Sequence, residues 1–364
     1  MATNHLGGTL SEITNEPLGY ITAATAFIML SGYMYALTAI SKAPTFKSLV
    51  AQACTRAAKI YRYHIGLFIL LLLPTLFSSV YKGYLGYLYT SDGSIFTSIA
   101  YAALLLHQPP FMHILPLYIV MSLVSPLILM ALHRGYDWLV ITASLTIWVI
   151  GQFYDPLKWL IAITDSSAAA AQFNLFGWQV LWVTGIYIGF LHHVRKRTIF
   201  FAHPAYLYFA IAGATAFFLT KHHFIVPPVS VEFYFENSDF RLLRFINTIS
   251  QVVIFCYVIK KVPTNLGLPW FRFLGRYSLQ VFSYHVLIVC LLAPISWRIG
   301  PRYGLTADLV YTLLVVASMT VPGLIYFAYE SYQRENNAYP PWRRRAVAIK
   351  ALGTRFFMTA SKSR

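Results

Sequence analysis

Long apolar runs alternate with short polar segments along most of the chain, and this pattern predicts membrane-spanning helices. A helix that crosses a bilayer needs about 20 mainly apolar residues. A further apolar run, from Phe96 to Leu106, is shorter and predicts an interfacial or re-entrant helix. We therefore expect an all-α, polytopic transmembrane bundle with nine full spans, at roughly 19–40, 64–81, 113–132, 137–151, 175–193, 202–220, 245–261, 276–297 and 307–330.

The first eight residues resemble the second half of a further membrane helix. They end in the pair Gly7-Gly8, which favours a break in the helix. We expect a truncated N-terminal helix here, with its first half missing and with His5 close to the break.

Basic residues divide the loops into two sets. With alternating loops, one set contains 41–63, 133–136, 194–201, 262–275 and the tail after 330. Together with Lys260, Lys261 and Arg276 at the adjoining helix ends, it holds 21 of the 28 Lys and Arg residues. Nine of the 12 acidic residues lie on the opposite side. The positive-inside rule then places the C-terminus in the cytoplasm and residues 1–18 outside.

Composition narrows the class of protein. Hydrophobic residues make up 58% of the 364 positions and charged residues only 11%, about half of what a soluble protein carries. The net charge of +16 lies largely in cytoplasmic segments, where anionic lipid headgroups explain it without a nucleic-acid partner. Cys54, Cys256 and Cys290 are far apart, and no metal-ligand spacing is present.

The chain shows no internal repeat and no soluble domain. We expect one membrane-embedded domain at 1–330 and a basic cytoplasmic tail at 331–364. Gly185 and Gly189 form a small-xxx-small pair, which favours close packing of two helices.

Two histidines are candidates for chemistry. An imidazole can act as a general base, and His5 carries this potential, although a solvated terminal histidine is the alternative. His285 lies within an apolar span beside Tyr284, where a helix–helix hydrogen bond is the alternative to a functional role. His107 and His113, in an outer loop around Pro109-Pro110, receive less weight.

Three cations at the cytoplasmic start of the second span form another candidate. Arg56, Lys59 and Arg62 are spaced three apart, so they should share a helix face. Such a face suits the phosphates of a nucleotide-like acyl carrier. Positive-inside anchoring is the alternative.

Several motifs together resemble the OpgC-type integral-membrane acyltransferases, relatives of the broader acyltransferase family three proteins. The matches follow the order expected of that family. They are Thr3-Asn4-His5, Pro17-Leu18-Gly19 with Ala23 to Gly32, Arg56 to His64, Pro109-Pro110 with Ile114 to Tyr118 and Pro126, and Leu274 to Leu279 with Val281-Phe282.

The resemblance implies a multi-pass enzyme of the bacterial inner membrane. It would move a succinyl-like acyl group from cytoplasmic acyl-CoA to a hydroxyl of a periplasmic glucan or another glycan. Its implied base is His5, with His285 and Tyr284 orienting the acceptor or stabilising the oxyanion. Arg56, Lys59 and Arg62 would bind the phosphates of the donor, and membrane lipids would surround the bundle.

Two departures from the family pattern favour an alternative function. The family opens with R-x-x-D-x-x-R-G before the Asn-His pair, and it favours Glu where Thr25 stands. Either the true start lies upstream and supplies a tenth span, or this is a degenerate member. In the second case we expect a non-catalytic transporter or a glycan- or lipid-binding membrane protein.

Overall fold

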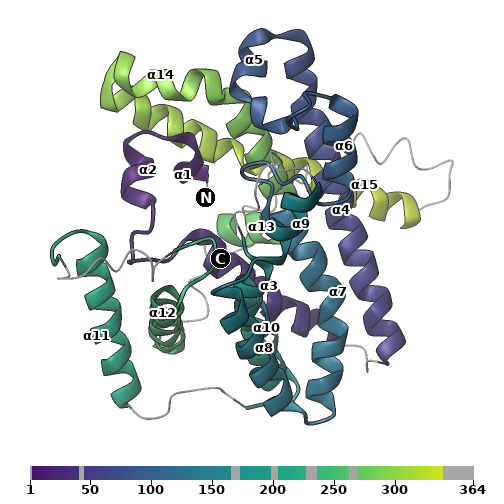
Figure 1. Ribbon diagram of the computed structural model, residues 1–364, viewed down its shortest axis with the longest axis vertical. Helices are drawn as coiled ribbons and strands as arrows, with labels where there is room; N and C mark the ends of the chain where they lie inside the picture. The colour runs from purple at the N-terminus through teal and green to yellow at the C-terminus, as the bar shows by residue number, and fades with distance from the viewer. Residues whose placement is uncertain are drawn as a thin grey trace.

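The described part of the chain is an all-helical bundle. The computed structural model describes residues 2–40, 45–164, 173–197, 204–226, 236–261 and 269–338, and these contain helices and turns but no strand. The all-α prediction is therefore confirmed for them (Figure 1). The helices are α1 (Ala2–Leu6), α2 (Thr9–Thr14), α3 (Ala23–Ile40), α4 (Phe46–Phe77), α5 (Ser79–Tyr84), η1 (Gly86–Leu88), α6 (Ile95–Ala103), α7 (Ile114–His133), α8 (Asp137–Gly151), α9 (Pro156–Thr164), α10 (Leu175–His193), α11 (Pro204–Lys221), α12 (Leu242–Lys261), α13 (Pro269–Arg276), α14 (Ser278–Ser318) and α15 (Thr320–Ala338).

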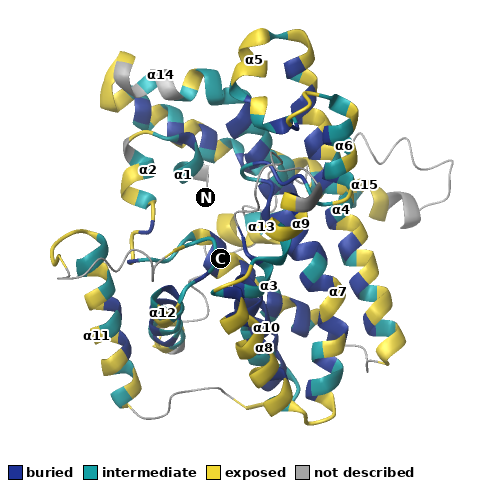
Figure 2. Ribbon diagram, in the orientation of Figure 1, coloured by how far each residue is buried: buried dark blue, intermediate teal, exposed yellow. Residues whose placement is uncertain are grey.

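Membrane crossing is supported by helix length and composition. Six helical stretches of the described chain are long and apolar enough to cross a bilayer, and two shorter apolar helices cover Ala23–Ala39 and Asp137–Gly151. Large apolar side chains remain exposed on the outer faces of α4, α8 and α11, as lipid contact requires (Figure 2). The count of nine spans stays a prediction. The six stretches are Phe46–Phe77, Ile114–His133, Leu175–His193, Leu242–Ile259, Ser278–Ser296 and Arg302–Arg334.

The last two predicted spans share helices α14 and α15. Gly304 interrupts α14 with φ +81°, a left-handed conformation that glycine adopts without steric cost. Met319, between α14 and α15, keeps right-handed helical angles, so the second spanning helix is nearly continuous across it. The predicted boundary at residue 330 is not visible as a break, because α15 continues to Ala338. The tail from 339 onward lies outside the described residues.

Helix α4 corrects the predicted second span. The apolar run predicted a span at 64–81 after a loop at 41–63, but α4 is helical from Phe46, and the side chain of Thr45 caps its first turn. At 1.5 Å per residue, 32 residues extend for about 48 Å, well beyond a hydrocarbon core of about 30 Å. Hydropathy detects only the apolar part of such a helix. The short run near Phe96 forms α6, a nine-residue helix.

Helices α3 and α10 run parallel in close contact. A Cβ on Gly189 would approach the Tyr33 carbonyl oxygen to 2.8 Å, and a Cβ on Gly185 would overlap the Met29 carbonyl. Gly32 on α3 faces the backbone of Trp182 in the same way. The prediction of close helix packing at the small-residue pair is confirmed, and α3 is the partner helix.

Polar contacts tie the loops together at two opposite ends of the bundle. At one end Arg195 makes a bidentate pair with Asp137, with N–O distances of 2.7 and 2.6 Å. At the other end the Asn174 amide donates to the carbonyls of Gly151 and Tyr154 and to Asp239. This pairing of loops matches the alternation that the basic residues predicted.

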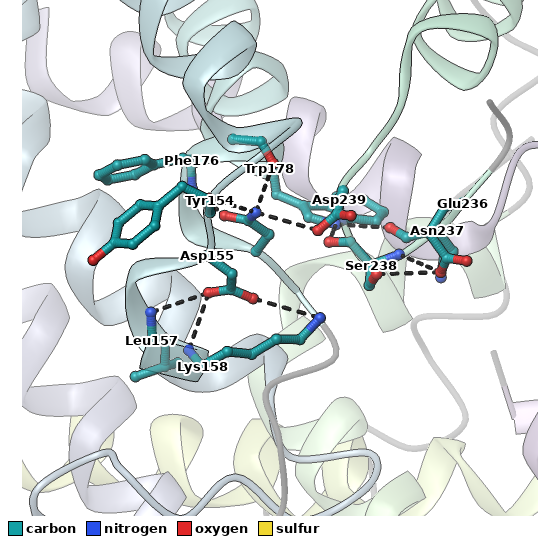
Figure 3. A network of polar contacts seen from close by, with 12 residues as sticks. Tyr154, Asp155, Leu157, Lys158, Phe176, Trp178, Glu236, Asn237, Ser238 and Asp239 are labelled. Carbon is teal, nitrogen blue, oxygen red and sulfur yellow. Dashed lines mark hydrogen bonds and ion pairs between the residues drawn. The ribbon is translucent and has the colours of Figure 1, made fainter. Parts of the chain in front are cut away.

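The second end is closed by a turn at residues 236–240. Figure 3 shows the Trp178 indole facing this turn, where it donates to the carbonyls of Asn237 and Ser238. Trp178 is fully buried, and its ring packs on Phe240. The turn therefore anchors the start of α12 to the start of α10.

Candidate active site

Two histidines that are 280 residues apart in the sequence meet in the structure. Nδ1 of His5 in α1 lies 3.0 Å from Nε2 of His285 in α14, and the two rings stack with centroids 4.9 Å apart. His285 is buried and His5 is partly exposed. The structure therefore brings His5 and His285, two of the residues predicted from the sequence, into direct contact.

One choice of tautomers suits a general base. The donor and acceptor roles in the His5–His285 contact depend on the tautomer of each ring. A neutral imidazole has one donor and one acceptor, so when Nδ1 of His5 carries the proton, Nε2 of His285 accepts from it. Nε2 of His5 then keeps its lone pair, which is the form that a general base requires.

The Pro109-Pro110 turn supplies two further residues. The ring of Phe111 packs on His5 at 4.4 Å, and Phe111 has φ +70°, which is unfavourable for a bulky residue and persists only where its surroundings hold it. His113 is buried two residues after Phe111, and its ring packs on Phe173 with centroids 4.6 Å apart. From the sequence, Phe111 and His113 lie in an outer loop, and the preceding proline pair was the only local signal of an ordered turn there.

Tertiary contacts hold α1 in place, because five residues are too few for a stable helix on their own. The helix break predicted at Gly7-Gly8 is confirmed, with φ +75° and +80°. The Thr14 hydroxyl donates to the Asn4 side chain at 2.6 Å. Leu6 is buried in a small apolar cluster with Val289, Val315 and Met319.

Tyr284 lies beside His285 on α14. It is partly buried, and its ring packs against the apolar cluster around Leu6. This places Tyr284 next to the helix that carries His5. Its catalytic role stays a prediction.

The three predicted phosphate ligands have different surroundings. The guanidinium of Arg56 lies over the rings of Tyr35 and Trp182, at 5.4 and 5.5 Å, and the residue is partly buried. Lys59 and Arg62 are exposed. A spacing of three residues turns about 60° short of a full circle, so two such steps separate Arg56 from Arg62 by about 120°.

A pocket lies beside the exposed cations. It has a volume of about 600 Å³ and opens between α4 and α7. Its mostly apolar wall and single cation suit a molecule that has both an apolar and an anionic part. The lining residues are Thr55, Ala57, Ala58, Tyr61, Arg62 and Ile119.

An ion network fixes the segment that follows α2. Glu16 is buried and pairs with Arg244 at 2.6 Å and with Lys221 at 2.5 Å. Burial acts to raise the pKa of Glu16, but the two cations outweigh it and hold the pKa below its ordinary value. Arg244 also donates to the Tyr20 carbonyl. The network attaches the α2–α3 connection to α11 and α12.

The described ranges contain no recognisable set of metal ligands. No group of three or more His, Cys, Asp or Glu side chains there is arranged to hold an ion. The hydrogen-bond and ring contacts that the structure describes for His5 and His285 include no carboxylate.

The apolar helices and the buried histidine pair define a multi-pass membrane protein with an internal polar site. The chain belongs to the OpgC protein family, whose model matches residues 1–331. No curated protein matches the chain, and neither does any solved structure. Family membership suggests a membrane acyltransferase that modifies glucans.

Proposed function

We propose that this protein transfers a succinyl-like acyl group from cytoplasmic acyl-CoA to a hydroxyl of a periplasmic glucan. Family membership supports the reaction class, and the His5–His285 hydrogen bond is the observation that carries the mechanism. The proposed location is the bacterial inner membrane, with the C-terminus in the cytoplasm. The grouping of loops at two ends of the bundle supports this arrangement.

In the proposed reaction, Nε2 of His5 takes the proton of the acceptor hydroxyl. The hydroxyl oxygen attacks the thioester carbonyl, the C–S bond breaks, and the thiolate leaves with the proton returned by His5. His285 stabilises the positive charge that develops on His5 by accepting its Nδ1–H. Tyr284 donates to the oxyanion or orients the acceptor.

For the donor, we propose that Lys59 and Arg62 bind the phosphates of CoA. Both are exposed on α4, and Arg62 borders the pocket between α4 and α7. Charge-assisted hydrogen bonds to phosphate are stronger than neutral ones, which suits a carrier that must bind from water. The position of the Arg56 guanidinium over two aromatic rings supports a separate role for this residue.

The test is the acyl content of periplasmic glucans in cells that express each variant. His5→Ala should lower acyl transfer by roughly 10²- to 10⁴-fold, which is the usual contribution of a general base. His222→Ala is the matched control, because His222 is an exposed histidine at the end of α11. Unchanged acylation in His5→Ala, with the protein present at normal level, would remove His5 from the mechanism and point to His285 as the base.

A further inference from the structure

Helix α1, which carries His5, contacts both halves of α14. In the first half, Nε2 of His285 lies 3.0 Å from Nδ1 of His5. In the second half, Val315 shares an apolar cluster with the buried side chain of Leu6. Gly304 breaks α14 between the two halves. The position of His5 therefore depends on contacts with both halves of one kinked helix.

The turn between α1 and α2 has no side chain of its own to cap α2. Gly8 directly precedes the first turn of α2, and its φ of +80° and ψ of −176° lie in a region that is essentially restricted to glycine. A serine, threonine or aspartate, which normally caps a helix start, would be strained there. The first N–H groups of a helix have no acceptor within it. A cap for α2 therefore has to come from another part of the fold or from water.

Asp308 places a buried carboxylate at this turn. The residue is only 4% exposed, and a Cβ at Gly8 would overlap one carboxylate oxygen and lie 2.6 Å from the other. A buried carboxylate is costly unless hydrogen-bond donors surround it. The start of a helix offers such donors, because its first backbone N–H groups point outward. The requirements of the carboxylate and of the uncapped turn therefore match.

The register of α14 connects Asp308 to the segment that holds His5. Asp308 and Val315 are seven residues apart, which is about two turns, so they lie on one face of the helix. On this face Asp308 meets Gly8, and Val315 lies in the cluster of Leu6, two residues earlier in the chain. His5 directly precedes Leu6. The carboxylate and the apolar cluster thus hold the same short segment.

We propose that Asp308 is a positioning residue for His5. Its carboxylate caps α2 in place of a side chain at Gly8, and so it keeps His5 at hydrogen-bond distance from His285. The importance of this position for turnover rests on the proposed acyl transfer, in which His5 is the base. Helix α1 has only five residues and cannot hold its own place. A displacement of about 1 Å at a reacting group can cost on the order of 10²-fold in rate.

The first test measures the position of residue 5 without the reaction. His5→Cys and His285→Cys are combined with Cys290→Ala in the full chain in membranes, and a short bifunctional thiol reagent joins the two new cysteines. Mass spectrometry quantifies the link. Asp308→Ala should slow its formation about three- to tenfold, which is the size of one lost helix cap. Asp308→Asn should slow it less than threefold, because asparagine also caps helices through its side-chain oxygen. Glu12→Gln is the matched control, because Glu12 is an exposed carboxylate in the first turn of the same helix, and it should leave the rate unchanged.

The second test measures turnover by the purified full chain with succinyl-CoA and periplasmic glucan. Asp308→Ala should lower kcat about ten- to a hundredfold and change KM for either substrate less than twofold, because the residues proposed to bind the donor lie on α4. Asp308→Asn should recover most of kcat. A merely structural role would lower the amount of folded protein and leave kcat per folded molecule unchanged. If Asp308→Ala does not fold, Asp308→Glu replaces it. This variant keeps the charge but moves the carboxylate by one methylene, so it should lower the cross-linking rate and kcat more than Asp308→Asn does.

Four results would overturn the positioning role. An unchanged cross-linking rate in Asp308→Ala would show that the carboxylate does not hold the turn. Equal damage by Asp308→Asn and Asp308→Ala, or a milder effect of Asp308→Glu than of Asp308→Asn, would show that charge matters and the cap does not. A loss confined to KM would assign Asp308 to substrate binding. Slower cross-linking in Asp308→Ala, together with no glucan acylation by the wild type, would instead refute the proposed function alone.

Discussion

The α3–α10 contact gives the sharpest prediction for stability. In Gly185→Ala the new methyl group would overlap the Met29 carbonyl oxygen and lie 2.9 Å from the Tyr33 backbone nitrogen. Ordinary contact begins at 3.4 Å, so the Tyr33 nitrogen alone requires about 0.5 Å of separation, and the overlapping Met29 carbonyl oxygen requires more. A gap of 0.5–1 Å already loses about a quarter to a half of the dispersion energy of each contact. Overpacking of this kind costs about 1–3 kcal/mol.

The measurement is the free energy of unfolding in mixed micelles, titrated with a denaturing detergent. Gly66→Ala on α4 is the matched control, because a Cβ at Gly66 has no neighbour within 4 Å. That change should stabilise the helix by about 0.5–1 kcal/mol, since alanine loses less backbone entropy than glycine. If Gly185→Ala is as stable as Gly66→Ala, the close parallel packing of α3 and α10 is refuted.

Three further predictions concern the ion network, the N-terminal turn and the topology. Glu16→Gln should cost about 3–5 kcal/mol at neutral pH, because it removes the carboxylate that balances the charges of buried Arg244 and half-buried Lys221. The pKa of Glu16 in the folded protein is lowered, so its contribution to stability is fully present above its ordinary pKa of 4.5. This contribution is lost as the pH falls through the folded-state pKa. The unfolding midpoints of Glu16→Gln and the wild type should therefore converge in acid. Gly8→Ala should lower glucan acylation more than Gly7→Ala. Both glycines have positive φ, but only a Cβ at Gly8 would clash with the Asp308 carboxylate. Equal losses of acylation would argue that backbone strain alone matters. Reporter fusions at the C-terminus and within 221–244 should report opposite sides of the membrane, and the same side for both would contradict the loop assignment.

The sequence by itself determined the helical class and the placement of most helices, because each apolar run must be long enough to cross a bilayer. It also determined the close approach at Gly185 and Gly189, since only small residues permit it. The extent of α4 was not predictable from hydropathy. Its first half is amphipathic and polar, so it lacks the apolar signal although the backbone is helical from Phe46.

Only the tertiary structure decided the composition of the site. His5 and His285 each appeared as candidates, but nothing local to either residue shows that they share a hydrogen bond. Phe111 joined them because its ring, after the Pro109-Pro110 turn, packs on His5, a contact between residues 106 positions apart in the sequence. Arg56 lies over Tyr35 and Trp182 while Lys59 and Arg62 are exposed, for the same kind of reason. Residue spacing fixes the angle between side chains on a helix, whereas the neighbouring helices decide which of those angles faces the interior.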